Sequence, residues 1–378
     1  MTLRRFLSLF ALAAFAAAAA LLAFNALRGR RDADERNIVE RLVARQIAEG
    51  HSVIPPPGLD EAALRWHVAQ ELTKAPAVGV LGSSHSLHLS GPMLGVHGLQ
   101  NFSISGGDMT EHIVTTTLLE RRGLSPRVWV IVVDPWYFDR STDFGMWKLR
   151  GAVLVAAERR LDQAAKPHIP AIFGPRWHPP AEATLSERFS ITPLVDWLDD
   201  IARRLAYRPT VVDPSKSDLP FLILRSDGAY QVTPDSDHAG DDSTELARRQ
   251  FVQDIDRHRY GSYERIDADL WMLFERWIDA CQASGSRVIL VLTPYHPSIY
   301  PKIVARPDNQ LQKIERMVRA FASRQHLPLF GSYDPSKLGM TAADFFDGDH
   351  LDDAGLRRLC APMVPVVRAD LDKEKAAR

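Results

Sequence analysis

The run RVWVIVVDP at residues 127–135 is the feature that most limits how this chain can fold. Its apolar residues are nearly continuous, which is typical of a strand buried on both faces of a parallel sheet. Other short β-rich runs lie at residues 76–82, 101–105 and 287–294, and helical stretches alternate with them. Such alternation predicts a doubly wound α/β domain, in which helices cover both faces of a parallel sheet.

A second pattern divides the chain into regions. Apolar residues at helical spacing predict helices over residues 37–50 and 59–74, separated by the breaker VIPPPG. The strand–helix alternation stops after Tyr137, resumes near Tyr260, and encloses one amphipathic helix at 193–205. We therefore expect an N-terminal segment, a helical linker region and an α/β domain that carries a large central insertion: residues 1–31, 32–75, 76–378 and, within the last, about 139–260.

The N-terminal segment holds an uncharged apolar stretch at residues 6–27, with arginines on both sides. About 20 apolar residues are enough for a helix to cross a bilayer. The stretch is either an uncleaved signal anchor or a signal peptide cut after one of its alanines. Because large apolar residues continue to its end, we favour a single-pass anchor in the cell membrane. The arginines that follow favour a cytoplasmic flank, but the short N-terminal tail is typical of an export signal, and we place the remaining chain in the periplasm.

Composition excludes several classes of function. The net charge of −1 gives no basic footprint for a nucleic-acid partner. The sequence contains neither a Gly-x-x-x-x-Gly-Lys run nor a Cys-x-x-Cys pair, so we expect no phosphate-binding loop and no structural zinc site. We expect no cofactor. Cys281 and Cys360 lie in apolar surroundings, which favours free buried thiols over a disulfide.

Polar residues gather where the predicted strands end. In an open α/β sheet, ligands bind beyond the carboxyl ends of the strands. The four strands and the last loop of the chain deliver five groups to that edge: Gly82–Ser86, Gly106–Gly107, Asp134, His296 and Asp347–His350. The sequence therefore predicts one site assembled from distant segments.

Ser84 is the candidate nucleophile of this site. A serine nucleophile needs a base, a group that holds the base, and donors for the developing oxyanion. Asp347 and His350 are spaced Asp-x-x-His, so His350 is suited to accept the serine proton and Asp347 to orient its ring. The backbone N–H of Ser84 and that of Gly106 or Gly107 are candidate donors. Taken alone, Ser84 is more typical of a turn or a helix cap than of a nucleophile.

Other polar residues in these segments carry weaker hypotheses. His85 and His88 have the i, i+3 spacing of metal ligands, but no third ligand accompanies them, so we predict no metal site. The acidic run 347–355 lacks the glycine position and the final glutamate of a calcium loop. His296 is a candidate substrate contact or a structural loop histidine. Trp136 and Tyr137 are candidates for stacking on a sugar ring or for core packing.

These motifs together resemble the SGNH (GDSL-type) hydrolase superfamily, over roughly residues 76–138 and 286–370. The Gly-x-Ser after the first strand, the glycines after the second and the C-terminal Asp-x-x-His carry the resemblance. Within the superfamily, the chain is similar to a membrane-anchored branch, which includes the alginate O-acetylation proteins and the D-alanyl transfer protein of teichoic acid assembly. The segments that carry this similarity are GSSHS, NFSISGG, VVDPWYF and the apolar N-terminal stretch.

The resemblance implies a flavodoxin-like three-layer α/β/α fold, with Ser84 as nucleophile, His350 as base and Asp347 as orienter. It implies transfer of an acyl or acetyl group to an envelope glycan, or hydrolysis of an ester, through an acyl-serine. An acyl donor, the glycan acceptor and a membrane-bound O-acyltransferase are the implied partners. The rival hypotheses are a catalytically inactive scaffold or glycan-binding subunit of such a system, and an esterase for soluble substrates.

The chain departs from the superfamily pattern at two positions. Ser83 stands where the family usually has an aspartate, and Asp134 stands near the place of an asparagine that donates to the oxyanion. An ionised Asp134 at that place would repel an oxyanion. We expect Gly106, Gly107, Asp134, His85 and His296 on the oxyanion and substrate side of the site, with Asp134 either protonated or turned away from the oxyanion.

Overall fold

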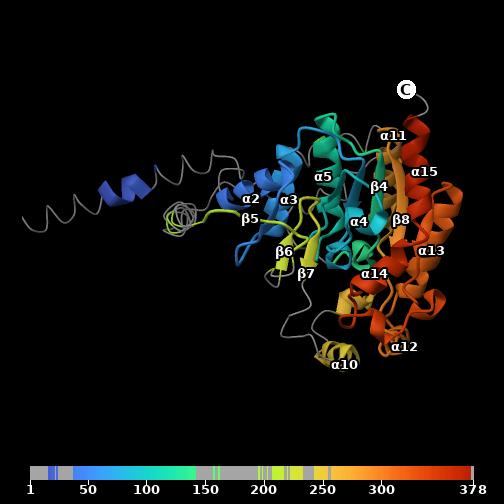
Figure 1. Cartoon of the computed structure of the whole chain (residues 1–378). Coiled ribbons are helices and arrows are strands. Elements are labelled where there is room, and N and C mark those ends of the chain that lie inside the picture. Colours follow the sequence, from blue (N-terminus) through green and yellow to red (C-terminus); the bar gives the residue numbers. More distant parts are fainter. Residues whose placement is uncertain are drawn as a thin grey trace, which may run out of the picture.

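The computed structural model describes most of the chain outside the N-terminus and the middle (Figure 1). The described residues are 37–141, 207–216, 222–232, 242–253 and 257–375, with short pieces at 16–21, 23, 156–157, 161, 195, 198, 202 and 219.

A five-stranded parallel sheet forms the centre of the domain. Its strands are β2 Val78–Leu81, β3 Leu99–Asn101, β4 Val128–Val132, β8 Arg287–Leu292 and β9 Leu329–Gly331. They lie side by side in the order β3-β2-β4-β8-β9, and every neighbouring pair is parallel. Counted along the chain this order is 2-1-3-4-5, one of the common orders of doubly wound sheets. The predicted parallel α/β sheet is confirmed.

Both faces of this sheet are covered by helices, which makes three layers. Along β4, Trp129 and Ile131 pack into one hydrophobic core, whereas Val128 and Val130 pack into the other. The first core is closed by α5 Met109–Arg121, α11 Ala268–Ala283 and α13 Leu311–Arg324. The second is closed by α4 Gly91–Leu94, α14 Asp353–Cys360 and α15 Val364–Lys375. Burial on both faces explains why the strands are apolar at nearly every position.

Short helical turns connect these elements, and several of them follow the carboxyl ends of strands. They are η2 Ser84–Ser86, η3 Pro135–Phe138, η5 Arg257–Tyr260, α12 Tyr300–Val304, η6 Pro335–Leu338 and η7 Ala342–Asp344. The carboxyl edge of the sheet is therefore built from tight turns, which hold polar side chains in fixed positions.

A second, antiparallel sheet joins the linker region to the insertion. The predicted helices of the linker are present as α2 Ile38–Ala48 and α3 Glu61–Glu71. Between them, β1 Ser52–Ile54 pairs with strands from the insertion, in the order β5-β1-β6-β7. Those strands are β5 Thr210–Val212, β6 Leu222–Leu224 and β7 Tyr230–Val232. The sequence did not predict β1, because its partners lie more than 150 residues away.

Two sequence predictions fall largely outside the described residues. The amphipathic helix predicted at 193–205 lies largely outside them, as does most of the apolar stretch 6–27. Among the helices that the structure describes, none is both long enough and apolar enough to span a bilayer. Cys281 and Cys360 are both buried, and they form no disulfide within the described residues, as predicted.

Candidate active site

Ser84 stands at the first turn beyond strand β2. The strand ends at Leu81, and Gly82 turns the backbone into η2, which begins at Ser84. A Cβ at Gly82 would collide with the Ser86 side chain and would lie 2.8 Å from Val132 Cβ. Only glycine fits at this close approach, so the Gly-x-Ser spacing follows from packing.

The other two serines of this segment hold the turn together. Ser83 Oγ accepts a hydrogen bond from the backbone N–H of His85 at 3.3 Å. Ser86 Oγ donates to the Ser83 carbonyl at 3.1 Å and lies 2.8 Å from Ser103 Oγ. Ser83 and Ser86 are completely buried, whereas Ser84 is partly exposed. Of the three hydroxyls, that of Ser84 is the one presented to a ligand.

His350 meets Ser84 across 266 positions of chain. Ser84 Oγ lies 2.7 Å from His350 Nε2, and His350 Nδ1 lies 2.9 Å from each oxygen of Asp347. Because a carboxylate only accepts, the Nδ1 proton points to Asp347, which leaves Nε2 of the neutral ring to accept from the serine. The predicted proximity of the Ser84 hydroxyl and the His350 imidazole is confirmed.

Asp347 is held by three further donors. The backbone N–H groups of Asp349 and His350 donate to its Oδ1 at 3.0 and 2.9 Å. The side-chain amide of Gln250 donates to its Oδ2 at 2.9 Å. Burial alone would raise the pKa of Asp347, but His350 and the Gln250 amide favour the charged form and lower it. Asp347 therefore stays ionised beneath the imidazole.

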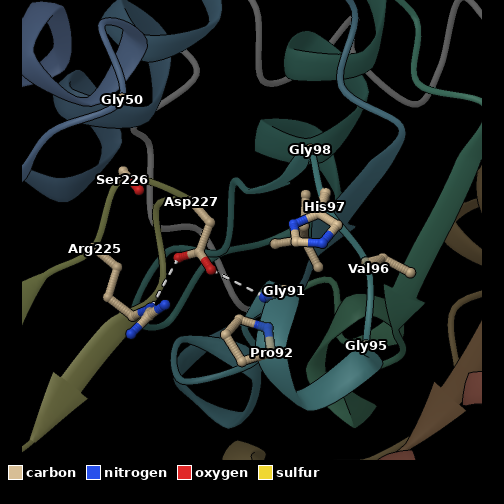
Figure 2. A pocket seen from close by; sticks show the side chains of 11 residues that line it. Gly50, Gly91, Pro92, Gly95, Val96, His97, Gly98, Arg225, Ser226 and Asp227 are labelled. Carbon is tan, nitrogen blue, oxygen red and sulfur yellow. Dashed lines mark hydrogen bonds and ion pairs between the residues drawn. The ribbon is translucent and has the colours of Figure 1, made fainter. Parts of the chain in front are cut away.

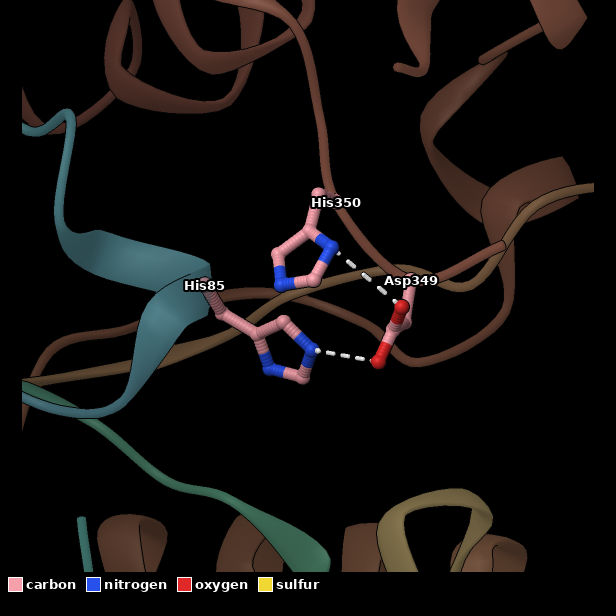
Figure 3. A group of neighbouring side chains, drawn as sticks. All are labelled: His85, Asp349 and His350. Atoms are coloured by element: carbon pink, nitrogen blue, oxygen red, sulfur yellow. Dashed lines mark ion pairs between the residues drawn. The ribbon is translucent and has the colours of Figure 1, made fainter. Parts of the chain in front are cut away.

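A buried series of charged side chains connects the serine turn to the histidine loop, and Figure 3 shows three of its members, His85, Asp349 and His350. His85 Nδ1 lies 2.7 Å from Asp134, and His85 Nε2 lies 3.5 Å from Asp349. Asp349 also lies 3.3 Å from His350 Nδ1 and accepts a hydrogen bond from Arg259 at 2.7 Å. Sequence reasoning missed Asp349 and Arg259 as members of the site, because Asp349 lies far from both His85 and Arg259 in sequence.

The charges in this series set the protonation of both histidines. Burial lowers the pKa of His85, but Asp134 and Asp349 outweigh it and raise that pKa to about 9. Burial likewise opposes the charge on His350, but Asp349 and Asp347 raise its pKa above the ordinary value. His85 is thus a fixed cation between two carboxylates.

The series of charged side chains also bears on metal binding. Ligand atoms of His85, Asp349 and His350 all lie within 4.8 Å of one another, close enough to share an ion. His85 Nδ1 faces Asp134 and Nε2 faces Asp349. A histidine that binds a metal must be deprotonated at the binding nitrogen, so an ion and a proton on His85 Nε2 exclude each other. The absence of a metal site stays a prediction.

Three residues predicted to contact substrate face the protein interior instead. Asp134 is completely buried, and its oxygens accept from His85 Nδ1 at 2.7 Å and from the Ser83 backbone N–H at 3.2 Å. The His85 side chain lies beneath the turn between Asp134 and Asp349. His296 is also completely buried, and its Nδ1 accepts from Ser298 Oγ at 2.8 Å. These residues support the site rather than touch a ligand.

The two glycines differ in their hydrogen bonding. The Gly107 N–H donates to the Ile104 carbonyl at 2.8 Å, so it is not available to an oxyanion. Neither the Gly106 N–H nor the Ser84 N–H donates to an acceptor within the described part of the chain. Ser84 and Gly106 are therefore the better candidate donors.

The structure also places Trp136, Tyr137 and His88, which carried weaker hypotheses in the sequence. Trp136 and Tyr137 are buried, and Trp136 Nε1 donates to the Gly107 carbonyl at 3.0 Å, so both rings belong to the core. His88 lies 3.9 Å from Asp353 and joins no group of metal-binding side chains among the described residues.

A separate cavity of about 560 Å³ lies elsewhere in the domain (Figure 2). Gly91, the loop that enters β3, and the β6–β7 turn line it. Within it, Asp227 accepts from the Gly91 N–H at 3.0 Å and lies 3.4 Å from Arg225. The cavity opens where β3 begins, whereas Ser84 follows the end of β2. Its lining includes no member of the Ser84 site.

Comparison with known proteins identifies no family for this chain: no family model matches the sequence, and no curated protein matches it. What the site does is therefore argued from its geometry and from the motifs themselves.

Proposed function

We propose that this protein is a serine-dependent acyltransferase or esterase that works through an acyl-Ser84 intermediate. The observation that carries the proposal is the hydrogen-bonded series Ser84–His350–Asp347, with 2.7 Å between hydroxyl and imidazole and 2.9 Å between imidazole and carboxylate. A nucleophile within hydrogen-bond reach of a base, itself oriented by a third group, is the arrangement of nucleophilic catalysis.

The chemistry follows from these contacts. His350 Nε2 takes the Ser84 proton while Oγ attacks the carbonyl carbon of an acyl ester. The ester C–O bond breaks, and the imidazolium returns the proton to the departing alcohol. An acceptor hydroxyl, or water, then attacks the acyl-serine and gives its proton to His350, which passes it to the departing Ser84 Oγ. Asp347 stabilises the imidazolium in both steps.

The backbone N–H groups of Ser84 and Gly106 are the proposed oxyanion donors. They replace the asparagine that the SGNH pattern usually supplies, since Asp134 is turned inward towards His85. The 2-1-3-4-5 strand order supports a flavodoxin-like fold of the SGNH type, because this order belongs to that architecture.

The proposed setting is the outer face of a cell membrane. The apolar stretch 6–27 supports a single-pass anchor in the bilayer, with the α/β domain in the periplasm. The resemblance to the membrane-anchored SGNH branch supports an envelope glycan as acyl acceptor and a membrane-bound O-acyltransferase as a partner.

Labelling with a fluorophosphonate tests the activated serine without knowledge of the natural substrate. We expect the full chain to take up one phosphonyl group, because Ser84 Oγ attacks phosphorus and fluoride leaves. Peptide mass spectrometry should place the group on Ser84. Ser84→Ala should remain unlabelled, whereas Ser83→Ala should react within about tenfold of the wild-type rate, since it loses one long neutral hydrogen bond. An unlabelled, folded wild type would favour the inactive scaffold.

A further inference from the structure

The carboxylate that orients His350 depends on a side chain from the central insertion. Helix α10, Ser243–Gln253, belongs to that insertion and lies at the periphery of the molecule (Figure 1). Apart from His350, Gln250 is the residue whose side chain donates to Asp347 within the described part of the chain. The sequence gives no sign of this contact, because 97 positions separate the two residues.

The Gln250 amide makes two hydrogen bonds to the histidine loop. Its Oε1 accepts from the backbone N–H of Gly348 at 2.9 Å, and its Nε2 donates to Asp347 Oδ2 at 2.9 Å. A backbone N–H can bond only to the oxygen of an amide, which fixes the amide orientation and aims the nitrogen at the carboxylate. Gln250 thus clamps Asp347 together with the residue that follows it.

Gly348 is what allows the helix to come this close. A Cβ at this position would lie 2.7 Å from Gln250 Oε1 and 3.4 Å from Ala247 Cα. The first distance is too short, so any side chain at this position would displace the Gln250 amide from the Gly348 N–H. The glycine of the Asp-Gly-Asp-His segment is therefore explained by the docking of α10.

Few other contacts hold α10 in place. Ala247 is the one residue of the helix that is buried, while Val252 is 68% exposed. Ser243 Oγ donates to the Ala342 carbonyl at 2.9 Å, and the Arg306 guanidinium lies 4.3 Å from the Phe251 ring centre. Phe251 also packs, partly buried, against the core, with its ring centre 6.1 Å from that of Tyr260. The two hydrogen bonds of Gln250 add to these contacts and join the helix directly to the histidine loop.

A second residue near the end of the insertion contacts the same loop. Arg259, in η5, donates to Asp349 at 2.7 Å, two positions beyond Asp347. The two acidic residues of the Asp-Gly-Asp-His segment are therefore each bonded to a side chain from the insertion.

We propose that Gln250 is a positioning residue, through which the central insertion holds Asp347, and so the base His350, in its working orientation. This inference rests on the proposed function of the Ser84 site. It assigns the insertion a part in the reaction: the site is complete only while α10 is docked.

The test is the rate at which a fluorophosphonate modifies Ser84 in the full chain, measured against pH. Gln250→Met matches the length of glutamine but forms neither hydrogen bond, and we expect it to react about 10- to 100-fold more slowly, the cost of one hydrogen bond to a charged group. Gln253→Met changes the same residue type at an exposed position of the same helix and should react at the wild-type rate.

Gln250→Glu separates positioning from mere attachment of the helix. The glutamate still accepts from the Gly348 N–H, but it places a second negative charge beside Asp347. That charge stabilises the His350 imidazolium, so the pH of half-maximal labelling should rise. A purely structural role would instead lower the labelled fraction of both variants and leave this pH unchanged. A labelled wild type with Gln250→Met within twofold of it would overturn this inference alone, whereas an unlabelled wild type would overturn the proposed function with it.

Discussion

Ser84→Ala is expected to lower the cleavage of a short-chain acyl ester, such as p-nitrophenyl acetate, by on the order of 10⁴- to 10⁶-fold, because members of a catalytic triad account for factors of this size. The hydroxyl is the atom that forms the new bond, and its 2.7 Å contact with His350 Nε2 is what makes it nucleophilic. The measurement is kcat for the full chain in detergent, with the fold monitored by circular dichroism.

Non-additivity distinguishes a catalytic unit from separate contributions. Once Ser84 is lost, His350 has no proton to accept, so Ser84→Ala combined with His350→Ala should be no slower than Ser84→Ala alone. A double variant that is slower than either single variant by the product of the two effects would show that the residues act independently. That result would contradict the triad.

The second large effect concerns stability. Asp134→Asn should lower the free energy of unfolding by about 3–5 kcal/mol, because it leaves the buried His85 cation without one of its two carboxylates. Asparagine has nearly the same volume as aspartate, so the loss reports charge and not a cavity. Urea unfolding at neutral pH measures it. Glu264→Gln, at an exposed position, is the matched control and should be nearly neutral.

The same cation makes stability depend on pH in a defined direction. His85 binds its proton more tightly in the folded chain, where its pKa is about 9, than in the unfolded chain, where it is near 6.5. Its contribution is complete below pH 6.5 and is lost as pH rises to about 9, which amounts to about 3 kcal/mol. Asp134→Asn should flatten this dependence. An unchanged slope would show that His85 is neutral in the folded protein.

The parts of the fold that follow from local sequence were predictable. Continuous apolar runs identify the central strands β2, β4 and β8, and the Asp-x-x-His spacing identifies the proposed base and its orienter. The edge strand β3 is Leu99–Asn101 rather than the predicted 101–105, because its sequence LQN has no apolar run. Strand β1 was not predictable. Its three residues, Ser52–Ile54, are too few to show a strand pattern, and they form a strand only because β5 and β6 of the insertion pair with them.

The side-chain environment of the site was the harder part. Sequence places Asp134, His85 and His296 at the correct edge of the sheet, but it does not show whether a side chain at a strand end turns outward or into the core. All three turn inward. Gln250 and Arg259 were missed for a different reason: their partners are set by the docking of α10 and η5 against a loop about 90 residues later.

The proposed function depends on a covalent bond forming at one oxygen atom, Ser84 Oγ. The direct measurement is rapid quenching of the full chain with an excess of an acetyl ester, followed by intact-mass and peptide mass spectrometry. The structure predicts one acetyl group per chain, bound to Ser84 and absent from Ser84→Ala. Consumption of the ester with the acetyl group on another residue, or with an unmodified Ser84 throughout turnover, would contradict it.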